Sequence, residues 1–165
     1  MPSSCVADRK LLVDKKCAEH LLPLLQAAFD ANNIELRGCE ETQRILKSIA
    51  PATEEDWHTE YLAPILSIKV VNGIEEAIDH INNYGSGHTD GIVTQSLNRA
   101  QTFEQQVDSA SVLINASTRL SGGGDYGLGS VIGISTDKLH ARGPVGPDEL
   151  TTYKWVAYGN GHLRK

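Results

Sequence analysis

The apolar positions of this chain change repeatedly between a two-residue and a 3.6-residue period. Alternating and β-branched runs are typical of strands, whereas apolar residues three or four positions apart are typical of helices. The run ILSIKVV, Ile65–Val71, is the clearest strand because it is rich in β-branched residues. The other predicted strands are Lys10–Asp14, Ile34–Arg37, Gly91–Gln95, Ser111–Ile114 and Lys154–Tyr158.

Segments with helical spacing separate these strands. Leucines and other apolar residues recur at that spacing in Ala18–Asn32 in spite of Pro23, and Ser96 or Asn98 can cap a later helix. The predicted helices are Ala18–Asn32, Glu40–Ile49, Ile74–Ile81 and Asn98–Val107. Strands that alternate with helices imply βαβ units. We therefore expect an α/β fold of three layers, in which helices flank a mainly parallel sheet.

The composition is that of a single soluble domain, with 165 residues of which 40% are hydrophobic and 22% charged. The net charge is -6 and the cations are dispersed, which argues against nucleic acid as the main partner. No apolar run is long enough to span a bilayer and there is no signal peptide, so we expect no membrane association. The number of cysteines, three, is odd and their spacing fits no zinc site, which favours a reduced, cytoplasmic setting. The sequence shows no pattern of metal ligands.

A glycine-rich run, 115–146, follows the predicted strand Ser111–Ile114. Glycine lets a backbone approach a ligand closely, and ligands gather at the carboxyl ends of parallel strands. We expect the run to cradle a ligand, with Ile132, Ile134 and Leu139 as buried anchors. The alternative is a surface loop without function.

Polar residues at the start of this run are candidates for binding. A small polar ligand could be bound by the amide and hydroxyl groups that follow the strand, while Arg119 and Arg142 can pair with carboxylate or phosphate. The same groups could equally serve to stabilise the loop. The triplet Gly122-Gly123-Gly124 is not a phosphate fingerprint, so no cofactor site is readable here. The ligand candidates are Asn115, Ser117, Thr118 and Arg119.

For two further residues, Cys5 and Glu60, the residue type alone does not decide between a functional role and none. Cys5 precedes the first predicted strand, and a nucleophile would need a thiolate-favouring, partly exposed position there. Without a neighbouring histidine, an ordinary terminal thiol is the better interpretation. Glu60 lies before the strand Ile65–Val71 and could accept hydrogen bonds from a ribose, although a solvated loop acid is favoured on sequence alone.

Several motifs occur in an order that covers nearly the whole chain. They are PSSC followed by LLVD, TEEDWHTEYLAPILSIKVV, VVNGIEEAIDHINNYGSGHTDGI, VLINASTRL, YGLGSVIGISTDKLHARGPVG and TTYKW. Together they resemble the C-terminal catalytic part of the gamma-glutamyl phosphate reductases (glutamate-5-semialdehyde dehydrogenases), a branch of the aldehyde dehydrogenase superfamily. The resemblance implies that residues 1–165 form the catalytic domain, which holds nucleophile and substrate, and that the cofactor-binding domain is absent.

The resemblance also implies a reaction, the NADPH-dependent reduction of L-glutamyl 5-phosphate to L-glutamate 5-semialdehyde in proline biosynthesis. Cys5 matches the nucleophile, whose thiolate attacks the acyl phosphate, expels phosphate and leaves a thioacyl-enzyme. Hydride from NADPH then gives a thiohemiacetal that collapses to the aldehyde. Glu60 matches the glutamate that contacts the nicotinamide ribose. Asn115, Ser117 and Thr118, with Arg119 beside them, fall in the loop that shapes the substrate pocket.

The chain departs from the family pattern after the nucleophile, where Val6, Arg9 and Lys10 replace Asn, Glu and Thr. These changes alter the surroundings of the thiol. We expect the isolated chain to fold but to have little or no reductase activity. One alternative is a non-catalytic oligomerisation or interaction module, in which Thr151–Lys165 adds a strand to another copy of the chain to give a homo-oligomer. Another is the reductase half of a bifunctional kinase–reductase.

Overall fold

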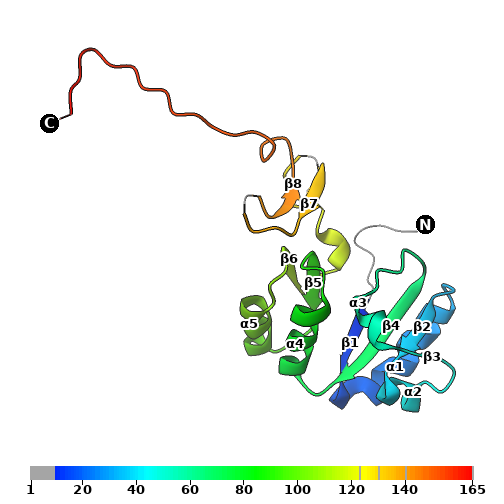
Figure 1. Ribbon diagram of the computed structural model, residues 1–165. Helices are drawn as coiled ribbons and strands as arrows, with labels where there is room; N and C mark the ends of the chain where they lie inside the picture. Colours follow the sequence, from blue (N-terminus) through cyan, green and yellow to red (C-terminus); the bar gives the residue numbers. More distant parts are fainter. Residues whose placement is uncertain (1–9, 123, 130, 140, 165) are drawn as a thin grey trace.

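A four-stranded parallel sheet forms the larger part of the fold (Figure 1). The structure is a computed structural model that describes residues 10–122, 124–129, 131–139 and 141–164. The strand order is β1-β4-β2-β3, so β4 is covered on both edges. The strands are β1 (Lys10–Asp14), β2 (Glu35–Gly38), β3 (Ala50–Pro51) and β4 (Ile65–Val71).

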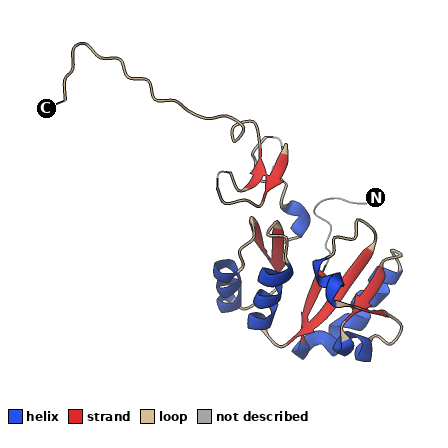
Figure 2. Cartoon of the chain, viewed as in Figure 1, coloured by secondary structure: helices blue, strands red, loops and turns tan. Residues whose placement is uncertain are grey.

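Two smaller sheets follow along the chain. The first is a parallel pair, and the second is an antiparallel pair within the glycine-rich run. Figure 2 shows these sheets above and beside the larger one. They consist of β5 (Thr89–Ile92) with β6 (Ser111–Ile114), and of β7 (Gly133–Ser135) with β8 (Gly143–Val145).

Helices connect the strands and cover the sheets. None of the helices in the described part of the chain is long and apolar enough to cross a membrane. The helices are α1 (Lys15–Asp30), α2 (Glu40–Ile45), α3 (Glu54–His58), α4 (Ile74–Tyr84), α5 (Leu97–Gln106) and the short 3₁₀ turn η1 (Thr118–Leu120).

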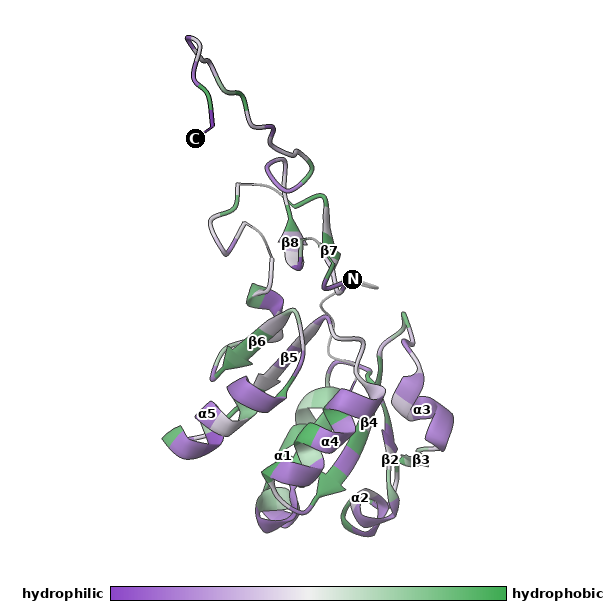
Figure 3. Cartoon of the chain, turned by 60° about the vertical axis from the view of Figure 1, so that its left-hand side comes forward, coloured by the Kyte–Doolittle hydropathy of each residue, from purple (hydrophilic) through white to green (hydrophobic). Residues whose placement is uncertain are grey.

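One face of the four-stranded sheet carries the main apolar core. Alternate residues of β1 and β4, among them Val13 and Ile68, pack against Leu22 of α1 and Leu46 after α2. Leu22 and Ile68 are fully buried. Figure 3 shows hydrophobic strands inside and hydrophilic helix surfaces outside. Burial of these side chains supplies the main stabilisation of this half of the fold.

The opposite face of the same sheet carries polar side chains. Ser67 and Lys69 of β4 point to this face, where they contact Tyr61 and His80. Helices α3 and α4 supply the residues that cover it, since Trp57 and His80 pack edge to face. Helices therefore lie on both faces, which confirms the predicted three-layer arrangement with a mainly parallel sheet.

The β5–β6 pair has its own small core. Ile78 of α4 packs with Phe103 and Val107 of the α5 segment, and all three are buried. Ser96 caps α5 because its hydroxyl accepts a hydrogen bond from the Arg99 amide. The alternative cap, Asn98, lies inside the helix.

Several predicted elements coincide with the structure and others do not. The bounds of β1, β4 and β6 are those predicted. Helix α2 ends at Ile45 instead of Ile49, because Leu46 leaves the helical conformation with φ -108° and ψ 85° and enters the core. The prediction also missed α3 and β3, which are too short to show a period.

The expected anchors of the glycine-rich run are mostly wrong. Ile134 is half-buried in β7, but Ile132 is 60% exposed and Leu139 is 80% exposed. The two-stranded β7–β8 hairpin has no helix layered upon it among the described residues, so its apolar side chains have little to pack against (Figure 1).

The predicted strand Lys154–Tyr158 is also wrong. The described residues from Thr151 onward contain no helix or strand and are exposed, and the segment runs away from the rest of the chain (Figure 1). A strand needs a hydrogen-bonding partner, and the pattern of aromatic and β-branched residues does not supply one.

Candidate functional site

The amino ends of β1 and β4 meet at one edge of the sheet. The two strands are parallel neighbours, with Lys10 opposite Ser67. Cys5 precedes β1 in the sequence and lies outside the described residues, whereas Glu60 precedes β4. The Lys10 ammonium donates to the Thr59 carbonyl at 3.4 Å, which ties the start of β1 to the segment that carries Glu60. The fold therefore places the segment that carries Glu60 beside the start of β1, the strand that Cys5 precedes in the sequence.

Asp56 anchors the segment that leads to Glu60. Its carboxylate accepts from the Thr53 amide at 2.6 Å and from the Thr53 hydroxyl at 2.8 Å, which caps α3. It also accepts from Arg37 Nη1 at 2.7 Å and from the Tyr61 hydroxyl at 2.5 Å. Asp56 is buried, so this dense hydrogen bonding is what permits an ionised carboxylate there.

The charge of this cluster follows from its contacts. Burial alone would raise the pKa of Asp56, but the hydrogen bonds from Tyr61, Thr53 and Arg37 outweigh it and hold the pKa well below its usual range. Hydrogen bonds to Glu35 and Asp56 raise the pKa of Arg37. Burial and the bond to Asp56 raise the pKa of Tyr61. The cluster is thus an ionised Asp56–Arg37 pair with a neutral Tyr61.

Glu60 itself is exposed on this anchored segment. An ionised carboxylate accepts hydrogen bonds only, and it can take two hydroxyl donors at once. The vicinal hydroxyls of a ribose have that character. Because the backbone on either side is fixed and the side chain is solvent-accessible, Glu60 fits the role of a ribose ligand. Between Thr59 and Pro64, Glu60 is the one residue with an ionisable acidic or basic side chain other than the Tyr61 phenol.

Asn115 lies where β5 and β6 end. Its side-chain oxygen accepts from the Thr94 amide and its side-chain nitrogen donates to the Thr94 carbonyl, both at 2.8 Å. Asn115 has φ 53°, a left-handed conformation that asparagine tolerates well. Its amide therefore joins the two strand exits and orients the loop that follows.

The other candidates of this loop are close together on η1. The Ser117 hydroxyl accepts from the Arg119 amide at 3.3 Å, and Thr118 packs near Gly91 of β5. Arg119 is exposed, and its guanidinium forms no ion pair with any residue that the structure describes. Arg142 differs, because it pairs with the Asp108 carboxylate at 2.9 Å. Arg119 is thus the better anion ligand of the two.

The glycine-rich run begins at the carboxyl end of β6 but folds back to the amino ends of β5 and β6. Thr89, the first residue of β5, donates to the Ser121 hydroxyl at 3.1 Å. Tyr126 donates to the hydroxyl of Ser111, the first residue of β6, at 3.2 Å. This part of the run therefore lies at the amino ends of the two strands and not at their carboxyl ends.

A second polar cluster lies between α3, α4 and β4. The buried His80 ring packs against Trp57 and Tyr84, with centroid distances of 5.3 and 4.6 Å. His80 Nδ1 lies 3.3 Å from the Lys69 ammonium, which must donate, so Nε2 carries the proton. Among the described residues, no acceptor meets that buried Nε2. His80 is therefore neutral in the fold.

This neutral histidine predicts a pH-dependent stability. Burial, and then the positive charges of Lys69 and Lys10, lower the pKa of His80 to about 4, opposed by Glu54 and Glu76. The unfolded chain takes up the proton near pH 6.5, so stability falls as pH decreases from that value toward 4. We expect a loss of about 2 kcal/mol between pH 7.5 and pH 5. Urea unfolding across this range measures it.

The matched variant is His80→Phe, which keeps a ring in the aromatic cluster but cannot be protonated. Its stability should depend less on pH than that of the parent chain by the same amount. Equal slopes for the two proteins, or a His80 resonance titrating near 6.5 in NMR spectra, would contradict the prediction.

Sequence reasoning missed the Asp56 cluster and the His80 cluster, although two signals were present. Thr53 and Asp56 have the spacing of a capping box, which marks the start of α3. Ser67 and Lys69 interrupt an otherwise apolar strand, which indicates a polar layer on one face. Within the described ranges, no group of three or more histidine, cysteine, aspartate or glutamate residues could hold a metal ion.

Comparison with models of protein families gives a match to part of the chain. The model of the aldehyde dehydrogenase family matches residues 44–127, about half of the chain. The matched region extends from the last two residues of α2 through η1 and includes Asp56, Glu60 and the loop at Asn115.

Individual relatives match over nearly the whole chain. Gamma-glutamyl phosphate reductase of Nautilia profundicola is 53% identical over 164 residues, which is 99% of this chain and 40% of that protein. The crystal structure of gamma-glutamyl phosphate reductase from Thermotoga maritima is 48% identical, with a TM-score of 0.94 over 99% of this chain and 40% of its own. The chain thus spans about two fifths of the length of these relatives.

A more distant structure shows the fold alone. An acetylating aldehyde dehydrogenase from Geobacillus thermoglucosidasius is 20% identical, with a TM-score of 0.67 over 98% of this chain and 45% of its own.

Proposed function

The chain belongs to the aldehyde dehydrogenase family, and we propose that it is the catalytic segment of an NADPH-dependent reductase that converts L-glutamyl 5-phosphate to L-glutamate 5-semialdehyde. In this proposal residues 1–165 form the catalytic domain, and a cofactor-binding domain completes the enzyme. The close relatives named gamma-glutamyl phosphate reductase support the substrate. The pathway would be proline biosynthesis, in the cytoplasm, where the thiols of Cys17 and Cys39 would stay free.

The observation that carries the proposal is the shared edge of β1 and β4. Cys5 precedes β1 in the sequence and Glu60 precedes β4, and Lys10 at the start of β1 contacts the Thr59 carbonyl next to Glu60. A nucleophile and a ribose ligand must flank the same reacting carbon. The parallel pairing of β1 with β4 supports the proposed proximity of the two residues.

In the proposed mechanism, the Cys5 thiolate attacks the acyl carbon of glutamyl phosphate. The carbon–oxygen bond to phosphate breaks, and phosphate leaves with its electron pair, which gives a thioester on Cys5. Backbone amides near Cys5 would stabilise the oxyanion. Arg119 would neutralise an anionic group of the substrate, while Ser117, Thr118 and Asn115 shape the loop around it.

NADPH, when bound, supplies the hydride that reduces the thioester to the aldehyde level. This chain would hold the ribose of the cofactor through the Glu60 carboxylate. The exposed carboxylate and its fixed backbone support that role. Collapse of the tetrahedral adduct releases the semialdehyde and returns the thiolate of Cys5.

A chimaera tests this proposal: this chain replaces the matching segment of the Nautilia profundicola reductase. We expect NADPH-dependent reduction of glutamyl phosphate by the chimaera, none by the isolated chain, and none after Cys5→Ser. A folded chimaera that turns over at the same rate with and without Cys5→Ser would contradict the role of Cys5. A folded chimaera that binds NADPH without turnover would contradict the reductase assignment.

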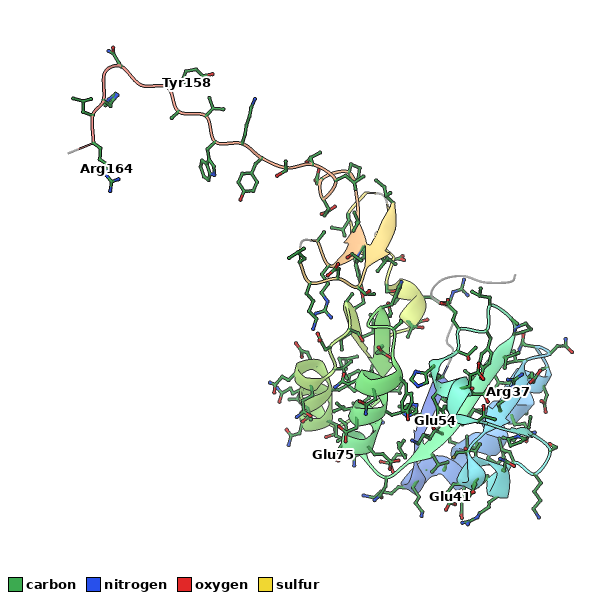
Figure 4. All side chains as sticks on the ribbon, in the orientation of Figure 1. Arg37, Glu41, Glu54, Glu75, Tyr158 and Arg164 are labelled. Carbon is green, nitrogen blue, oxygen red and sulfur yellow. The ribbon has the colours of Figure 1, made fainter. Side chains whose placement is uncertain are left out.

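A second candidate function is an interaction module, which the exposed tail supports. Tyr153, Trp155 and Tyr158 are each more than 80% exposed, and Figure 4 shows Tyr158 and Arg164 far from the body of the chain. Such a segment could add a strand to another copy of the chain. Light scattering after size exclusion would show a homo-oligomer that dissociates when residues 151–165 are deleted. A monomer at all concentrations would exclude this function.

A further inference from the structure

The backbone around Glu60 is fixed on both sides. Before it, the Thr59 amide donates to the Glu55 carbonyl at 3.0 Å, and the Thr59 carbonyl accepts from Lys10. After it, the Pro64 carbonyl accepts from the Glu35 amide at 2.8 Å. These bonds fasten the ends of a short irregular segment to α3 and to the sheet.

Tyr61 is the side chain that holds the middle of this segment. Its hydroxyl lies 2.5 Å from Asp56 Oδ1 and 2.5 Å from Ser67 Oγ. Because an ionised Asp56 can only accept, Tyr61 donates to it and Ser67 donates to Tyr61. The Arg37 guanidinium lies 5.1 Å from the centre of the Tyr61 ring. Tyr61 is thus connected at once to α3, β2 and β4.

The side chains on either side of Tyr61 point to solvent. Glu60 and Leu62 are both exposed, Leu62 at 67%. Leu62 has φ 51°, a left-handed conformation that is unfavourable for leucine. Such a conformation persists only where the surroundings determine it. The Tyr61 side chain is anchored directly before this residue.

We propose that Tyr61 and Asp56 are positioning residues, which hold the Glu60 carboxylate in a single orientation toward the ribose of the cofactor. The inference rests on the proposed role of Glu60. A carboxylate on a mobile loop would lose conformational entropy when the cofactor binds, and a fixed segment avoids that loss. Tyr61 and Asp56 touch neither cofactor nor substrate in this proposal, and they act through Glu60 alone.

The test is the variant Tyr61→Phe, which keeps the ring and removes both hydrogen bonds. In the chimaera, we expect the KM for NADPH to rise about tenfold while the KM for glutamyl phosphate stays unchanged. In the isolated chain, the NMR order parameter of the Glu60 amide should fall from about 0.85 to below about 0.6. Tyr84→Phe is the matched control, since the Tyr84 hydroxyl also donates to a carboxylate, that of Glu54, at 2.5 Å. It should change neither quantity.

The double variant separates positioning from a general loss of structure. If Tyr61 acts through Glu60, Tyr61→Phe should add nothing to the KM change of Glu60→Gln. Additive effects, or an unchanged KM for NADPH in Tyr61→Phe, would overturn the inference while Glu60 keeps its role. If Glu60→Gln itself leaves the KM for NADPH unchanged, the proposed role of Glu60 fails, and the inference fails with it.

Discussion

Replacing Asp56 by alanine is expected to lower the free energy of unfolding by about 3 kcal/mol at neutral pH. The substitution removes one carboxylate that four donors share, from Thr53, Arg37 and Tyr61. The Thr53 amide and the Tyr61 hydroxyl then lose their acceptor in a partly buried position, and Arg37 keeps only Glu35 as an ion-pair partner among the described residues. Urea unfolding measures the change.

Glu55→Ala is the control, because Glu55 lies in the same first turn of α3 but is exposed. It should alter stability by less than about 0.5 kcal/mol. The pKa of Asp56 is below its usual range in the fold, so its contribution is complete above the ordinary carboxyl pKa and is lost as pH falls below it. A loss for Asp56→Ala that equals the loss for Glu55→Ala would show that the cluster does not stabilise the fold.

The sequence predicted most of the sheet because its strands are buried. Lys10–Asp14 and Ile65–Val71 are apolar on the face that meets α1. Because that face must be buried, the apolar residues recur in a pattern that is recognisable in the sequence. The β6 strand Ser111–Ile114 is recognisable for the same reason, as it packs on Phe103 and Val107. Such elements are specified locally, since each must present an apolar surface wherever its partners lie.

Other elements depend on contacts that no local pattern reveals. Ala50–Pro51 forms a strand only because it lies beside Arg37 and Gly38 of β2. Helix α2 ends where Leu46 turns into the core, although the apolar spacing continues to Ile49. The opposite case is Lys154–Tyr158, which has the residue types of a strand but forms no strand, because it has no strand partner within the described part of the chain.

In the candidate site, too, some residues are recognisable in the sequence and others only in the structure. The order of the surrounding motifs identifies Glu60 as a candidate. The segment that carries Glu60 is supported by Arg37 and Ser67, which are distant from each other in sequence and adjacent in the sheet. In the sequence, Ser67 is a single polar residue within an apolar strand. Only the structure shows that its hydroxyl is hydrogen-bonded to Tyr61. The residue types proposed for the reaction are therefore visible in the sequence, but the residues proposed to orient them are not.

The second large effect is expected in the apolar core, where Leu22→Ala should lower the free energy of unfolding by about 2–5 kcal/mol. Leu22 is fully buried where α1 packs on the sheet, and its contacts include the cluster of Val13, Leu36 and Ile68. The truncation removes transfer free energy and leaves a cavity that rigid strands cannot close.

Leu24→Ala is the matched control, because Leu24 lies on the same helix and is 60% exposed. The same truncation there should cost less than about 0.5 kcal/mol, since little apolar surface is withdrawn from water at that position. The two variants share helix propensity, so the difference between them isolates burial. Equal losses would mean that α1 does not pack on the sheet through Leu22, and that a different core supports β1 and β4.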